Sequence, residues 1–159
     1  CFVGKIGWKT EKLIERIKQH PQLNKRLFMF NDLSDRELEY CYSHSRALVF
    51  PSYVEGFGLP LVEAMQRGLP AMASDIPVFR EIGGDSMAYF GLSEPESLCR
   101  LVRRFEGSGQ FPAPISLDNW SWLSWSDSAM QLIGRVQGQT KRQQAARASI
   151  KSNADYGRP

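Results

Sequence analysis

The sequence is poor in the residues that build metal sites and disulfide frameworks. It holds only three cysteines and two histidines in 159 residues. The cysteines are odd in number, lie far apart and show none of the paired spacings of zinc sites, so we expect neither a disulfide framework nor a structural zinc. Free thiols are typical of a reducing compartment, which predicts a cytoplasmic location. The three cysteines are Cys1, Cys41 and Cys99.

Long apolar segments are also missing. No run approaches the roughly 20 apolar residues that a membrane-spanning helix needs. The opening residues 1–5 (CFVGK) are not the basic stretch and long apolar stretch that mark a signal peptide. The first residue is not methionine, and Phe2 and Val3 read as the end of a strand. We therefore expect the chain to begin inside a longer protein.

The body of the chain lacks an excess of basic residues. The net charge is +3, but residues 139–159 hold five basic residues against one acidic residue. We therefore expect no nucleic-acid binding by residues 1–138. The basic tail, 139–159, is expected to be solvated and partly disordered, and the alternative is peripheral contact with an anionic membrane face.

Short apolar runs of strand length alternate with helix-forming segments along the chain. Such alternation predicts an α/β fold with a doubly wound parallel sheet. Helices are expected to start at Thr10, at Ser34 with a capping box to Glu37, around Pro60, which suits a first helical turn, and at Pro95. Two further helices are expected at about 78–82 and 126–136. Strands are expected to end at Val3 and to span 27–30, 47–50, 71–74 and 87–90.

The most informative stretch is the glutamate segment, residues 55–63 (EGFGLPLVE), which places Glu55 and Glu63 eight positions apart. An apolar strand precedes it and a helix follows it. Glycines let a backbone approach a ligand closely, and free amides at a helix N-terminus attract anions. In parallel α/β sheets, ligands bind beyond the carboxyl ends of the strands. Two carboxylates can accept hydrogen bonds from hydroxyl groups on either side of a phosphate. This arrangement would suit a nucleotide sugar, in which a ribose and a hexose flank the pyrophosphate.

Several flanking motifs, taken with the glutamate segment, resemble the nucleotide-sugar-binding domain of GT-B glycosyltransferases of the large retaining family 4 type. The resemblance runs from about Val3 to Val136 and is closest to bacterial mannosyl- and rhamnosyltransferases. It implies a Rossmann-like domain over 1–138, the C-terminal half of a GT-B enzyme without its first strand. The motifs are Phe50-Pro51-Ser52, Glu63-Ala64-Met65, Gly68-Leu69-Pro70, residues 74–85 (SDIPVFREIGGD) and Trp125-Ser126.

The resemblance also implies roles for individual residues. Glu55 would be the catalytic-site carboxylate that contacts the donor-sugar hydroxyls, and Glu63 would hold the ribose. Backbone amides around Gly56, Phe57, Gly58 and Leu59 would face the sugar and pyrophosphate. The loop after the second strand, with Phe30, Asn31 and Leu33, would lie against the base.

The implied reaction transfers a hexose, of mannose type, from a nucleoside-diphosphate sugar to a glycan or lipid-linked acceptor in polysaccharide or lipopolysaccharide synthesis. No cofactor or metal is expected, and no Asp-x-Asp motif is present. Catalysis would need the protein's own N-terminal domain, so this chain alone is expected to be inactive, at the inner membrane face or free in the cytoplasm.

Other functions stay open. An epimerase or a phosphorylase can share the fold, and a non-catalytic nucleotide-binding module can retain the glutamates. A nicotinamide-dependent oxidoreductase is disfavoured, because residues 56–61 (GFGLPL) lack the third glycine of the dinucleotide motif.

Overall fold

The computed structural model describes residues 1–138, and the predicted basic tail, 139–159, lies outside the described residues. The described residues form two compact units, Cys1–Trp120 and residues 121–138. In the second unit, a helix covers residues 125–138, close to the predicted 126–136. Ser124 caps it by accepting a hydrogen bond from the Asp127 amide at 3.1 Å. The first unit carries every predicted site residue.

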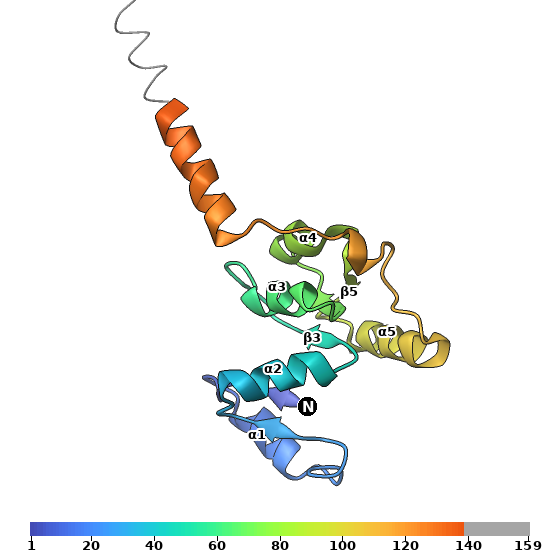
Figure 1. Cartoon of the computed structure of the whole chain (residues 1–159). Coiled ribbons are helices and arrows are strands. Elements are labelled where there is room, and N and C mark those ends of the chain that lie inside the picture. Colours follow the sequence, from blue (N-terminus) through green and yellow to red (C-terminus); the bar gives the residue numbers. More distant parts are fainter. Residues whose placement is uncertain (139–159) are drawn as a thin grey trace, which may run out of the picture. The chain divides into compact units, whose positions relative to one another are not determined.

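The first unit has five short strands, and every strand pair in it is parallel (Figure 1). This confirms the predicted parallel α/β class. The strands form two ladders, β1–β2 and β3–β4–β5, where we expected one sheet. A sheet is continuous only where neighbours exchange ladder hydrogen bonds, and within the described residues β1 and β3 exchange none. The strands are β1 (Phe2–Val3), β2 (Met29–Phe30), β3 (Leu48–Phe50), β4 (Ala71–Ser74) and β5 (Ala88–Phe90).

The predicted second strand is shortened at its start. Leu27 belongs instead to a tight turn, in which its amide donates to the Gln22 carbonyl at 3.0 Å. The same residue makes an isolated bridge with Leu23. Turn hydrogen bonds therefore use the backbone groups that would have extended β2.

The helices begin at, or next to, the residues that the sequence predicts. The capping box at Ser34 is complete, because its amide donates to Glu37 Oε2 at 2.8 Å and its hydroxyl accepts from the Glu37 amide. Pro60 stands in the first turn of α3. None of the helices described in residues 1–138 has the length and apolarity needed to cross a bilayer. The helices of the first unit are α1 (Glu11–Lys18), α2 (Asp35–His44), α3 (Leu59–Gln66), α4 (Pro77–Gly83) and α5 (Pro95–Ser108), with 3₁₀ turns at Gly84–Ser86 and Leu117–Asn119.

The core is built around β4, all four residues of which are buried. Ala71 and Ala73 belong to one cluster with residues of α3 and α4, including Leu61 and Phe79. Met72 belongs to a second cluster with β5, against which α5 packs. Because alternate residues of a strand point to opposite faces, helices cover both faces of this sheet. Because β3, β4 and β5 pair in parallel, their carboxyl ends share one edge of the sheet. The loop with the glutamate segment follows β3 at this edge.

Candidate functional site

Glu55 lies in the loop after β3, and a chain of two serines holds its carboxylate. The Ser52 hydroxyl donates to Glu55 Oε1 at 2.8 Å. The Ser74 hydroxyl, fully buried at the end of β4, donates to the Ser52 carbonyl at 2.5 Å. Because Ser74 belongs to the buried central strand, it ties the loop that carries Glu55 to the rigid part of the sheet.

Gly58 shapes the turn between Glu55 and α3. Its φ of 91° is the left-handed region that favours glycine. A Cβ there would come within 2.8 Å of the Phe79 ring. The backbone can therefore turn into α3 directly above a buried aromatic ring only because residue 58 has no side chain.

The N-terminus of α3 has no side-chain cap. The amides of Gly58 and Leu59 therefore stand at the positive end of the helix dipole without a side-chain acceptor, which suits a phosphate. Phe57 and Leu59 are about half exposed, at 53% and 48%, so this edge offers apolar side chains as well as amides. A Cβ added at Gly56 would meet nothing within 4 Å, so the fold itself has no steric need for glycine there.

Glu63 lies one turn further along α3 and is half-buried. The Tyr42 hydroxyl donates to its Oε2 at 3.0 Å from the neighbouring helix α2. Burial, followed by the hydrogen bond to Glu63, raises the pKa of Tyr42 to about 12. The phenol therefore stays protonated at neutral pH and remains a donor to the carboxylate.

The three residues predicted to face the base lie at and after the end of β2. Phe30, the last residue of the strand, is 39% exposed and stacks with Phe28 at a centroid distance of 6.3 Å. Asn31 is exposed and Leu33 is half-buried in the turn that leads to the Ser34 cap. Helix α2 links this loop to Glu63 through Tyr42.

Asp75 directly follows β4 at the same edge of the sheet. Arg80 donates to both of its carboxylate oxygens, at 2.7 and 2.8 Å. These hydrogen bonds lower the pKa of the Asp75 carboxyl and raise the pKa of Arg80. The guanidinium also lies 3.9 Å from the centre of the Tyr89 ring. Both charges are thereby engaged with each other beside the glutamate segment.

The hydroxyl donors around the two glutamates were not predicted from the sequence. Ser52 stands in a quoted motif, but nothing in the pattern assigns it to Glu55. Tyr42 and Glu63 are 21 positions apart, so only tertiary packing shows their pairing. In residues 1–138, no group of three or more His, Cys, Asp and Glu side chains is placed to hold a metal ion. A metal-independent reaction remains a prediction.

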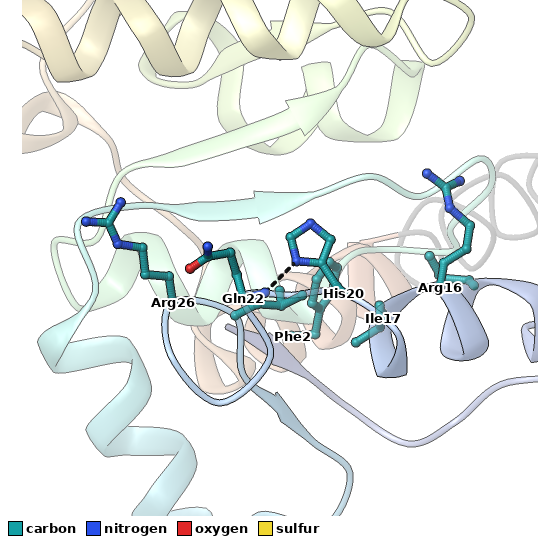
Figure 2. A pocket seen from close by; sticks show the side chains of 8 residues that line it. Phe2, Arg16, Ile17, His20, Gln22 and Arg26 are labelled. Carbon is teal, nitrogen blue, oxygen red and sulfur yellow. Dashed lines mark hydrogen bonds between the residues drawn. The ribbon is translucent and has the colours of Figure 1, made fainter.

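A hollow of about 420 Å³ lies elsewhere in the first unit (Figure 2). None of the predicted site residues lines it. In Figure 2, Arg16 and Arg26 stand on opposite sides of the view, and His20 Nδ1 accepts a hydrogen bond from the Gln22 amide at 3.2 Å. The residues that line the hollow come from β1, α1 and the turn before β2, so the hollow is separate from the glutamate segment.

Comparison with known proteins gives a family and several relatives. Residues 1–109 match the model of the family described as glycosyl transferases group 1. The serotype-specific mannosyltransferase WbdA of Escherichia coli is 43% identical over 132 residues, 83% of this chain. The O-antigen chain mannosyltransferase RfbU of Salmonella typhimurium is 32% identical over 121 residues, 76% of this chain. The O-antigen biosynthesis glycosyltransferase WclY of Escherichia coli is 31% identical over 64% of this chain.

The chain is much shorter than these relatives. The matched region spans 16% of WbdA, 33% of RfbU and 28% of WclY. Both predicted glutamates, the serines that hold Glu55 and the tyrosine that holds Glu63 lie within the residues that match the family model.

Proposed function

Because this chain belongs to the glycosyl transferases group 1 family, we propose that it is the donor-binding domain of a retaining, metal-independent glycosyltransferase. The donor is a nucleoside-diphosphate hexose, of mannose type, and the acceptor is a glycan or glycolipid of a bacterial surface polysaccharide. One observation carries the proposal: two carboxylates flank the uncapped N-terminus of α3, and a hydroxyl donor holds each of them.

Glu55 is proposed to orient the donor sugar. Ser52 donates a hydrogen bond to Oε1 of Glu55, which leaves Oε2 to accept a hydrogen bond from a sugar hydroxyl. A carboxylate whose rotamer is already fixed loses less conformational entropy when the sugar binds. This role makes Glu55 a catalytic-site residue that aligns the anomeric carbon rather than a nucleophile.

The α3 N-terminus is proposed to stabilise the leaving group. As the bond from the anomeric carbon to the phosphate oxygen breaks, its electron pair moves onto the diphosphate and positive charge develops on the sugar. Amides near Gly58 and Leu59, preoriented by the helix, favour the growing negative charge. The Glu55 carboxylate offsets the positive charge of the sugar. This division of charge would need no metal.

Glu63 is proposed to hold the ribose, and the loop with Phe30, Asn31 and Leu33 to contact the base. Acceptor binding would come from the protein's own N-terminal domain, so the chain is expected to bind a donor without turning it over. A cytoplasmic position, peripheral at the inner membrane face, would bring the site to a lipid-linked acceptor.

A calorimetric titration of the chain with ADP, GDP, UDP and dTDP, and with their common hexose conjugates, tests donor binding. We expect one base to bind, and Glu63→Ala to weaken that binding at least about tenfold, as expected for the loss of a charge-assisted hydrogen bond. Glu96→Ala is the matched control, because Glu96 is exposed on α5. If neither the chain nor a version extended at its N-terminus binds any of these nucleotides, the proposal is wrong.

Sugar transfer by the full-length protein tests the reaction. Donor-dependent transfer to a glycan acceptor should be lost with Glu55→Ala. Release of a sugar phosphate would indicate a phosphorylase instead, and an epimerised nucleotide sugar would indicate an epimerase. Nucleotide binding without either reaction would indicate a non-catalytic module.

A further inference from the structure

We propose that Tyr42 is a positioning residue that sets the chain's preference for a ribose with free hydroxyls, by holding the carboxylate of Glu63. The inference rests on the proposed function, since it assumes that Glu63 meets the ribose. Within residues 1–138, Tyr42 is the side chain that donates to this carboxylate, at 3.0 Å to Oε2, and Oε1 has no protein donor. Oε1 is thus left to accept a hydrogen bond from a ribose hydroxyl.

Tyr42 is itself held firmly in place. Its side chain is only 8% exposed and belongs to a buried cluster with Ala64 and Leu69. Leu38 and Leu48 pack against the same cluster. A ring enclosed from α2, α3 and β3 cannot change rotamer freely, so its hydroxyl oxygen has a defined position above Glu63.

Arg67 adds a second link between the same two helices. Its Nη1 donates to the Glu63 carbonyl oxygen at 2.7 Å, and its Nε pairs with Glu39 Oε2 at 2.7 Å. The guanidinium also lies 5.0 Å from the centre of the Tyr42 ring. Both the backbone and the carboxylate of Glu63 are therefore tied to neighbouring side chains.

The arrangement favours a role in recognition over mere packing. A glutamate side chain has several rotatable bonds, and an unrestrained one loses that freedom when it binds a ribose. The Tyr42 hydroxyl removes part of this cost before the ligand arrives. Helix α2 also begins directly after the predicted base-contacting loop, 30–33, so the element that supports the ribose carboxylate is continuous in sequence with the loop on the base side.

Calorimetry of Tyr42→Phe with matched ligands tests the inference. ADP, GDP and UDP are each compared with the 2′,3′-dideoxy form, which lacks both ribose hydroxyls. We expect Tyr42→Phe to raise the Kd of the ribose form about fivefold to tenfold, the usual net size of one intramolecular hydrogen bond, and to leave the Kd of the dideoxy form unchanged. The ratio of the dideoxy Kd to the ribose Kd, which measures the preference for the ribose hydroxyls, should therefore fall.

Two control variants separate positioning from stability. Tyr40→Phe makes the same chemical change on an exposed ring of α2, and Glu96→Ala removes an exposed carboxylate of α5, outside the network that holds Glu63. Both should leave the ratio unchanged. If Tyr42→Phe raises both constants equally, or tightens ribose binding, the positioning role is wrong while donor binding stands. If the wild-type chain, with and without an N-terminal extension, binds no nucleotide, the proposed function fails and this inference fails with it.

Discussion

Replacing Gly58 with alanine tests how the turn into α3 is built. Gly58 has a φ of 91°, and a Cβ there would lie 2.8 Å from Cε1 and 3.3 Å from Cδ1 of Phe79. Phe79 is fully buried in the cluster that covers β4, so its ring has little room to withdraw. The substitution therefore combines backbone strain with crowding of the core.

The two costs can be estimated separately. A non-glycine residue in the left-handed region costs about 1–2 kcal/mol. Forcing an extra carbon into a packed core costs typically ~1–3 kcal/mol. The free energy of unfolding should consequently fall by about 2–5 kcal/mol in Gly58→Ala, a large share of the roughly 5–15 kcal/mol that stabilises an ordinary domain.

Urea unfolding followed by circular dichroism measures this loss, and Gly68→Ala is the matched control. Gly68 also has a positive φ, of 72°, but nothing lies within 4 Å of its Cβ position. Only the strain should remain there, about 1–2 kcal/mol. In a Phe79→Leu background, which replaces the crowded ring, Gly58→Ala should cost less than in the wild type. Equal losses at Gly58 and Gly68 would refute the crowding.

Three further outcomes are expected. Ser74→Ala removes the hydroxyl that donates to the Ser52 carbonyl, so urea unfolding should show a loss of about 0.5–1.5 kcal/mol and calorimetry should show weaker binding of a nucleotide sugar; unchanged binding would contradict the support of Glu55. Gly56→Ala should leave the Tm nearly unchanged, because its Cβ position is open, yet weaken nucleotide-sugar binding if that backbone faces the donor; full binding would contradict that contact. Burial raises the pKa of Tyr89 to about 12 from the ordinary value of 10.0 for a tyrosine. The folded state then holds this proton more tightly than the unfolded state, so stability present below pH 10 is lost as the pH rises toward 12. Thermal unfolding between pH 8 and 12 should show a shallower alkaline loss for Tyr89→Phe, and an unchanged slope would contradict this assignment.

Local signals allowed much of the fold to be predicted. The capping box at Ser34, Pro60 in a first helical turn and the apolar run at 71–74 each act over a few residues, and each lies where predicted. The C-terminal end of α3 follows the same logic. The Gly68 amide donates to the Met65 carbonyl and the Leu69 amide to the Ala64 carbonyl, the Schellman pattern that a glycine permits.

Contacts between residues that are far apart in the sequence could not be predicted from such local signals. The division of the strands into two ladders depends on which neighbours pair, and no local pattern encodes that choice. Gly58 was predicted to let the backbone approach a ligand closely, but the Phe79 ring beside its Cβ position adds a packing reason for glycine that only the tertiary structure shows. Likewise, the glutamates were predicted as a pair, whereas the hydroxyls that hold them come from β4, the β3 loop and α2.

The order of strands β3, β4 and β5 has a consequence for how long each part of the site stays folded. They pair in chain order, as two successive strand–helix–strand units that share β4, which is buried along its whole length. The amide hydrogens of β4 should therefore exchange with solvent only when the whole unit unfolds, whereas the two-residue ladder of β1 and β2 should exchange through local opening. Ser74, which holds the Ser52 carbonyl, would then belong to the part of the unit that opens last. The loop proposed to contact the base, residues 30–33, would adjoin the part that opens first.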